Sequence, residues 1–175
     1  MLFRSVAKIG YGLNSNEFIG KYLDVNDSSD VKIDHMLAAG NWNLFDQSGL
    51  KDMVRCEQND IEVHLASVFA GGYVFRQKDV PYRYGIEDDK AAEKEKMWTA
   101  WNELCEKYDV TMAAVAIKFA ALPKVVTKII LGMKSKAEVD LIFECMEEGE
   151  KVPMDIFHDA QKAGLIRPEV QLPPL

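Results

Sequence analysis

The sequence predicts an α/β fold in which four parallel strands alternate with helices. Short apolar runs rich in β-branched residues occur four times, and each is followed by a stretch with helical periodicity or a helix cap. Strands separated by helices pair in parallel through right-handed crossovers. Four such units in 175 residues fit either a small open sheet or half of an eight-stranded barrel. In both architectures, the functional residues lie at the C-terminal ends of the strands.

The first two units fill the N-terminal third of the chain. Val6–Leu13 is predicted as a strand, and Asn14 or Ser15 is expected to cap the helix that follows. The remaining elements of this part are a helix over Glu17–Leu23, a loop over Asn26–Asp30, a strand over Ile33–Leu37 and a helix over Gln47–Glu57.

The third unit begins with a strand over Ile61–Phe69 and continues into Ala70-Gly71-Gly72, where missing side chains would let a ligand approach the backbone. Polar residues 75–89 are expected to form a long surface loop. Two helices follow, over Ala91–Tyr108 and Met112–Leu122, and the helical spacing of Trp98 and Trp101 favours a place in the core.

The last unit holds the strongest local signal for a binding site. A strand over Val125–Leu131 stops at Gly132, and Ser135 with Glu138 three residues later forms a capping box that opens a helix to about Met146. Helix N-termini favour phosphate, and Lys134 adds a positive charge there, although most strand–helix junctions bind nothing. The chain is expected to end with a short helix over Val152–Lys162, stopped by Gly164, and an irregular tail over Pro168–Leu175.

The composition argues against several partners and locations for this protein. A net charge of −7 argues against nucleic acid or an anionic membrane as the main partner. No apolar stretch reaches the length of a membrane helix and the first residues are too polar for a signal peptide, so a cytoplasmic location is expected. The cysteines, expected to be reduced packing residues, are Cys56, Cys105 and Cys145; the histidines, which lack metal-ligand spacing, are His35, His64 and His158.

Four segments, taken in order, resemble the last four strands of the aldo-keto reductases. They are Ile9–Asn14, Leu37–Ser48, Val68–Gly72 and Gly132–Ser135. The closest branch is the D-threo-aldose (L-fucose) 1-dehydrogenase group, with its L-galactose dehydrogenase relatives, and the resemblance covers about residues 6–166. It implies a partial (β/α)8 TIM barrel, with strands five to eight forming one domain over residues 1–175 and helices outside. The family binds NAD(P) without a GxGxxG motif, and none follows a strand here.

The resemblance also implies a set of cofactor contacts. Asn14 matches the residue on the nicotinamide carboxamide, and the side-chain amide suits that role, although Asn14 could equally be only a helix cap. Ala39 and Ala66 depart from the family, because they replace a glutamine and an aromatic residue that contact the nicotinamide. The pyrophosphate loop matches Ser67, Val68, Phe69 and Gly71, and the adenosine ribose loop matches Gly132, Lys134 and Ser135. Glu138 stands where NADP-preferring members often carry arginine, which tilts the prediction towards NAD.

Two functions from different classes remain open. The family's catalytic Asp, Tyr, Lys and His come from the first four strands, which have no match here, so no catalytic or metal residue is assigned. The first hypothesis is the cofactor-binding half of an oxidoreductase that, in a complete barrel, transfers hydride between NAD(P) and an aldose or small carbonyl. The second is a non-catalytic interaction protein that pairs, or self-associates, through its open strand edges. A truncated reading frame would give the same sequence.

Overall fold

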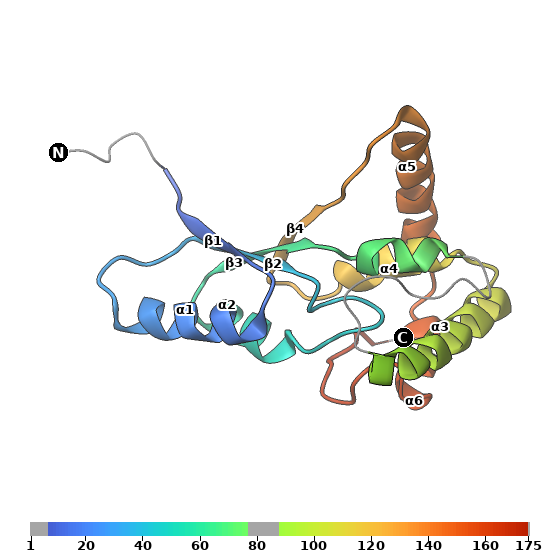
Figure 1. Cartoon of the computed structure of the whole chain (residues 1–175), viewed down its shortest axis with the longest axis horizontal. Helices are drawn as coiled ribbons and strands as arrows, with labels where there is room; N and C mark the ends of the chain where they lie inside the picture. The colour runs from blue at the N-terminus through green and yellow to red at the C-terminus, as the bar shows by residue number, and fades with distance from the viewer. Residues whose placement is uncertain (1–6, 77–87, 175) are drawn as a thin grey trace.

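The computed structural model of the chain describes residues 7–76 and 88–174. It contains one sheet of four strands in the order β1-β2-β3-β4, and every neighbouring pair is parallel (Figure 1). The strands are β1 Gly10–Leu13, β2 His35–Ala39, β3 Glu62–Ala66 and β4 Val126–Ile130. The prediction of four parallel βα units in sequence order is confirmed.

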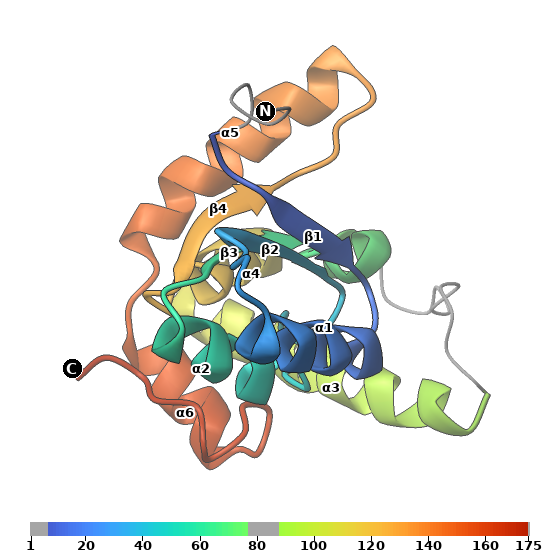
Figure 2. The ribbon, with the colours of Figure 1, turned by 90° about the vertical axis from the view of Figure 1, so that its left-hand side faces the viewer.

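Helices follow each strand and lie mainly on one side of the sheet. Their bounds are α1 Asn16–Ser28, α2 Leu50–Gln58, the 3-10 helix η1 Ala70–Phe75, α3 Asp88–Tyr108, α4 Met112–Ala120, α5 Lys136–Lys151 and α6 Asp155–Lys162. In Figure 1, α1 and α2 lie side by side below the sheet, whereas α5 rises beyond the end of β4. Figure 2 shows the same α5 extending past the sheet on the side of β1 and β4.

The two faces of the sheet differ in burial. On the face towards the helices, Met36 and Val63 are each 1% exposed. The alternate residues His35 and Leu37 are only half-buried. Parallel sheets in closed α/β folds are covered on both faces. The alternation therefore shows that the described residues cover one face of the sheet and leave the other partly uncovered.

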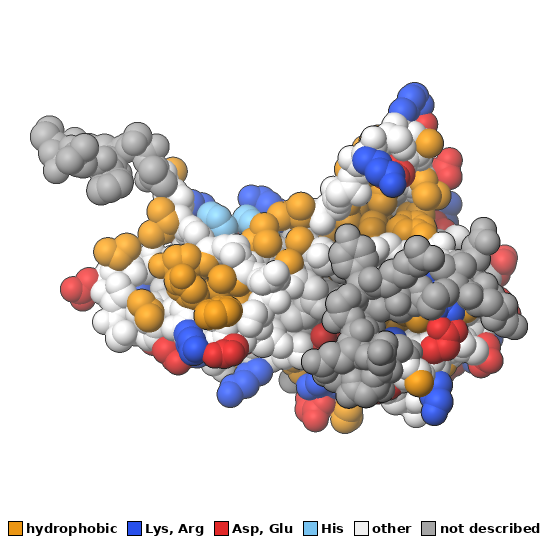
Figure 3. All heavy atoms as spheres, viewed as in Figure 1, with side chains coloured by type: hydrophobic (Ala, Val, Ile, Leu, Met, Phe, Trp, Pro, Cys, Tyr) orange, Lys and Arg blue, Asp and Glu red, His pale blue; other side chains and the backbone are white. Residues whose placement is uncertain are grey.

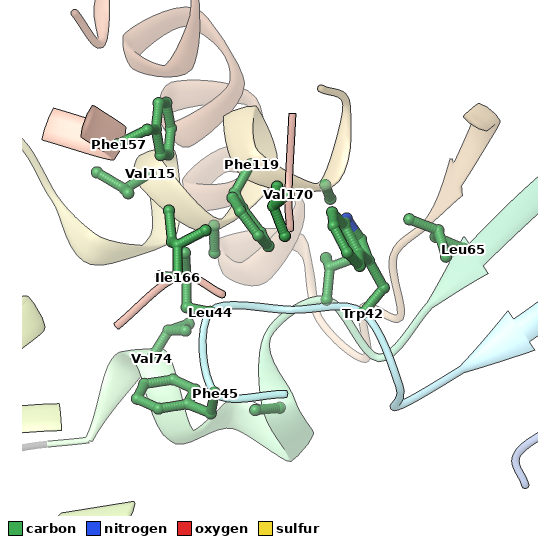
Figure 4. Close-up of a cluster of buried hydrophobic side chains, with 14 of the residues drawn as sticks. Trp42, Leu44, Phe45, Leu65, Val74, Val115, Phe119, Phe157, Ile166 and Val170 are labelled. Atoms are coloured by element: carbon green, nitrogen blue, oxygen red, sulfur yellow. The ribbon is translucent and has the colours of Figure 1, made fainter. Parts of the chain in front are cut away.

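The core joins the loop after β2 to α4 and α6 (Figure 4) and, through Trp101, to α3. Trp42 stacks on Phe119 with ring centroids 5.0 Å apart, and Phe119 in turn lies 6.0 Å from Phe157. Trp101 is fully buried, and its indole N–H donates to the Leu44 carbonyl at 3.0 Å. Trp98 is also buried, so the prediction that both α3 tryptophans are core residues is confirmed.

The structure corrects the bounds of the first two strands. β1 begins at Gly10 rather than Val6, although Val6 itself lies outside the described residues. β2 runs two residues later than the predicted Ile33–Leu37, because the Ile33 N–H donates to the Asn26 side chain at 2.9 Å rather than joining the sheet. α1 continues to Ser28, into the predicted loop, and Asn26 is buried in its last turn.

Other element bounds also differ from the prediction. β3 ends at Ala66 rather than Phe69 because Ser67 has φ 59°, which turns the backbone out of the strand. α2 begins at Leu50 because the buried Gln47 side chain donates to the Asn43 carbonyl at 3.1 Å, within the loop. Four more helices differ in length or position: α3 starts at Asp88 rather than Ala91, α4 ends at Ala120 rather than Leu122, α5 continues past Met146 to Lys151, and α6 begins at Asp155 rather than Val152.

Two further predictions concern the segment between β3 and α3 and the C-terminus. Residues 70–75 form a 3-10 helix rather than an open loop, and most of the predicted loop over 75–89 lies outside the described residues. After α6, Gly164 has φ 79° and residues 168–174 contain no regular element, as expected.

Candidate functional site

A cavity of about 620 Å³ lies between the C-terminal ends of β3 and β4. Its walls come from the end of β3, from η1, from the β4–α5 junction and from the first turns of α5. It is lined by Ala66, Ser67, Phe69, Gly71, Gly72, Phe75, Ile130, Leu131, Gly132, Glu138, Leu141 and Ile142. This is the edge of the sheet at which ligands bind in α/β folds, and the volume suits a drug-sized or nucleotide-sized molecule.

The wall after β3 is a tightly wound segment with an unusual backbone. Four of its residues have positive φ: Ser67, Ala70, Gly71 and Gly72, at 59°, 49°, 67° and 93°. Val68 is 1% exposed and fixes the segment to the core. Phe69 and Phe75 contact each other edge-to-face with centroids 4.9 Å apart, so the two ends of the segment meet beside the cavity.

The opposite wall is the N-terminus of α5, which the chain caps itself. Ser135 Oγ accepts from the Glu138 N–H at 3.2 Å, as the capping box predicts. The Glu138 carboxylate accepts from the N–H of Lys134 at 2.9 Å rather than from the N–H of Ser135, which corrects the second half of that motif. Lys134 Nζ lies 3.6 Å from the same carboxylate. An anionic group of the protein therefore already lies at the positive end of the helix.

The structure brings together most of the predicted binding residues. Five of the nine line the cavity: Ser67, Phe69, Gly71, Gly132 and Glu138. Val68 lies buried beneath the β3 wall, and Lys134 and Ser135 flank Glu138 at the start of α5.

Asn14 is separate from this group. It follows β1, which is separated from β3 by β2, and its side chain is exposed. Of the two predicted caps, Ser15 rather than Asn14 is the N-cap of α1, and the Ser15 side chain makes no hydrogen bond to the helix. Asn14 is therefore not among the described residues that line the cavity.

Sequence reasoning missed the apolar side of the cavity. Phe75, Ile130, Leu141 and Ile142 resemble ordinary core residues, and nothing in their type distinguishes a cavity wall from a packed interior. One signal was available for Leu141, because it lies three residues after Glu138 and therefore on the same side of α5.

Comparisons with known proteins identify the family. A family model described as "Aldo/keto reductase family" matches residues 9–167. The chain belongs to the aldo/keto reductase family. Among curated relatives it is similar to pyridoxal 4-dehydrogenase of Microbacterium luteolum, with 24% identity over 159 residues, or 90% of this chain and 44% of that protein.

A solved relative supports the fold. The chain is similar to the glycerol dehydrogenase AKR11B4 of Gluconobacter oxydans, with a TM-score of 0.58 and 13% identity. The match covers 94% of this chain and 52% of that one. This aldo/keto reductase chain therefore spans about half the length of the relatives it matches, and its four parallel strands correspond to part of a TIM barrel.

The three cysteines of this aldo/keto reductase chain do not line the cavity. The three cysteines are buried and unpaired in helices, as predicted, and burial raises the pKa of the Cys56 thiol to about 11 and that of Cys105 to about 12. These thiols stay protonated and unreactive near neutral pH. Within residues 7–76 and 88–174, no cluster of three His, Cys, Asp or Glu residues could hold a metal ion. In that same part of the chain, no helix is long and apolar enough to span a bilayer.

Proposed function

We propose that the chain is the cofactor-binding half of an NAD(P)-dependent aldo/keto reductase domain. The observation that carries the proposal is the cavity of about 620 Å³ that joins the β3 wall to the N-terminus of α5. The family resemblance predicted that these two distant segments would hold one ligand, and the cavity is bounded by both. When bound, the nicotinamide cofactor supplies the hydride chemistry, and the chain's residues bind and orient it.

The geometry supports a distinct role for each wall. Gly71 and Gly72 leave the backbone of the β3 wall open to a pyrophosphate, while Ser67 offers a hydroxyl. At the other wall, Gly132, Lys134 and Ser135 would hold the adenosine ribose, and the Glu138 carboxylate would accept from its hydroxyls. A carboxylate there repels an added 2′-phosphate, which favours NAD over NADP.

The substrate side of the site depends on residues that this chain lacks. Asn14 would meet the nicotinamide carboxamide only in a barrel whose other strands are present. Such a barrel would oxidise or reduce an aldose or other small carbonyl, within the branch that the sequence resembles. The relatives' names, pyridoxal 4-dehydrogenase and glycerol dehydrogenase, are compatible with small carbonyl or alcohol substrates. The purified chain is expected to show no NAD reduction with L-fucose or L-galactose.

A blocking substitution tests cofactor binding directly. A Cβ added at Gly132 meets no atom within 4 Å, so Gly132→Leu is expected to add an apolar side chain to the cavity wall without a clash at Cβ. Gly20 has the same free space, lies on α1 and does not line this cavity, so Gly20→Leu is the matched control. Calorimetry should give wild type and the control a Kd for NAD of roughly 40 µM to 1 mM, about −6 to −4 kcal/mol. Equal binding by Gly132→Leu would remove the cavity from the proposal, and no binding by wild type would refute it.

A second function, as a non-catalytic interaction protein, is supported by apolar side chains beside both open edges of the sheet. Phe18, Tyr22 and Val25 are exposed on α1 next to β1, and Phe143 and Met146 are exposed on α5 beyond β4. Figure 3 shows hydrophobic side chains gathered over the region of β1 and α1. Unpaired edges flanked by apolar helices favour association with another polypeptide.

Size-exclusion chromatography with light scattering, repeated during an NAD titration, separates these two functions. A monomer that binds NAD supports the cofactor role alone. An oligomer whose size is independent of NAD, together with no NAD binding, supports the interaction role.

A further inference from the structure

Arg76 is a buried cation at the point where the cavity wall ends. It is the C-cap of η1, directly after Phe75, and its N–H donates to the Tyr73 carbonyl at 3.2 Å. Its side chain is only 5% exposed. Arginine is rarely buried to this extent unless its charge is paired, so its partners indicate what it does.

Two aromatic rings and one carboxylate surround the guanidinium. Its centre lies 4.8 Å from the Tyr73 ring and 4.4 Å from the Trp98 ring, which places it between η1 and α3. It forms a two-pronged ion pair with Glu95 of α3, in which Nη1 donates to Oε2 at 2.6 Å and Nη2 donates to Oε1. Nη1 also donates to the Tyr73 hydroxyl at 3.0 Å.

The pKa of Glu95 is consistent with this ion pair. The hydrogen bond from Arg76 is the main cause that holds the pKa of this carboxyl below its usual range. The ion pair is therefore present throughout the neutral range.

We propose that Arg76 is the positioning residue that fixes the β3 wall of the cavity in its binding shape. The inference rests on the proposed cofactor site, and Arg76 does not itself line the cavity. The wall contains the adjacent Gly71 and Gly72, which give it little intrinsic stiffness. Val68 anchors its beginning in the core, and Arg76 anchors its end to α3. Phe75, which does line the cavity, is the residue directly before Arg76.

The arrangement requires arginine in particular. A guanidinium is planar, so it stacks between two rings while it offers two parallel donors to one carboxylate. A lysine ammonium at the same place pairs with Glu95 but cannot do both. Arg76→Lys therefore separates the effect of shape from the effect of charge.

Amide hydrogen exchange of the cofactor-free protein tests the positioning role. Exchange of residues 70–76 in Arg76→Gln is expected to be about tenfold faster than in wild type, because the stacked guanidinium and its two parallel hydrogen bonds to Glu95 are lost locally. Arg76→Lys should stay close to Arg76→Gln, and exchange in β2 should stay unchanged in both. Arg55→Gln is the matched control, since Arg55 pairs with Asp24 and Asp27 between α1 and α2, away from this wall.

Three results would overturn the proposal. They are unchanged exchange over residues 70–76 in Arg76→Gln, full rescue by lysine, and an equal acceleration in Arg55→Gln. If Arg76→Gln fails to fold, Glu95→Gln replaces it, since Glu95 is half exposed and the stacked guanidinium stays in place; its exchange must then also rise.

NAD titration distinguishes failure of this inference from failure of the proposed function. If exchange rises as expected and wild type binds NAD, the Kd of Arg76→Gln should rise severalfold, and an unchanged Kd would refute the positioning role in binding. If exchange rises but wild type binds no NAD, the proposed cofactor site is refuted, while the anchoring of the wall by Arg76 is still supported.

Discussion

The substitution Glu138→Gln tests whether the charge of Glu138 sets the preference for NAD over NADP, because it removes the charge and keeps the hydrogen bond. In Glu138→Gln, the remaining side-chain oxygen still accepts from the Lys134 N–H, which the carboxylate accepts from at 2.9 Å in wild type. The cap of α5 is therefore kept, and Ser135 continues to accept from the N–H of residue 138. Any loss of attraction between a carboxylate and the helix dipole, about 0.3–1 kcal/mol, acts on both cofactors equally.

The expected shift in preference follows from Coulomb's law. A carboxylate and a 2′-phosphate carrying about −2 charge, about 6 Å apart in water, repel by about 1.4 kcal/mol. Wild type should therefore bind NAD about tenfold more tightly than NADP. The substitution Glu138→Gln should bring the two affinities close together, and Glu138→Arg should favour NADP.

Calorimetric titration of both cofactors at low ionic strength measures the ratio, because salt screens a surface charge. Glu144→Gln, an equal charge change on the exposed side of α5, is the control and should leave the ratio at its wild-type value. Tighter binding of NADP by wild type would show that Glu138 is not near the 2′ position. So would a ratio that Glu138→Gln leaves unmoved.

Two further predictions concern stability. A Cβ added at Gly10 would lie 2.2 Å from the His35 carbonyl oxygen, so Gly10→Ala should lower the free energy of unfolding by about 1–3 kcal/mol in urea. Gly12→Ala, whose added Cβ meets nothing closer than 3.9 Å, should stay within about 0.5 kcal/mol of wild type, and equal losses would contradict the clash. The hydrogen bond from Lys107, at 2.6 Å, lowers the pKa of Asp159. The stabilisation that the ionised Asp159 gives the fold is therefore complete above the ordinary carboxyl pKa of 3.8, and it is lost as the pH falls below that value. In Asp159→Asn, the melting temperature should fall less than in wild type as the pH is lowered below 3.8. If wild type and Asp159→Asn show the same dependence of melting temperature on pH, the Lys107–Asp159 pair contributes nothing to stability.

The existence and order of the elements followed from local patterns, but their limits depended on contacts between distant residues. β-Branched runs predicted four strands, and helical spacing placed Trp98 and Trp101 in the core. The start of β2 could not be read in this way, because it depends on a hydrogen bond from Ile33 to Asn26, seven residues earlier. The end of β3 depends on the left-handed conformation of Ser67, which could not be predicted from a serine in the sequence.

In the candidate site, too, some features could be predicted from the local sequence and others depended on tertiary packing. The glycines and the capping box marked the two walls, because their special backbone needs are visible in the sequence. Phe75 could not be found from the sequence, since an apolar side chain looks the same whether it meets a cavity or another side chain, whereas the helical spacing of Leu141 from Glu138 was the one available signal. Arg76 was missed for a different reason: the burial of its charge is visible only once α3 packs against η1.

The backbone of the β3 wall has a consequence for the thermodynamics of ligand capture. Ser67 and Ala70 hold left-handed conformations that cost non-glycine residues of order 1–3 kcal/mol each. This cost is offset when the chain folds, by the burial of Val68 and of Ala70 itself. The conformational entropy of the segment is therefore lost before any ligand arrives, and an incoming pyrophosphate would meet a surface that needs no further ordering. Association at this wall should accordingly show a small entropic penalty and little change in backbone exchange.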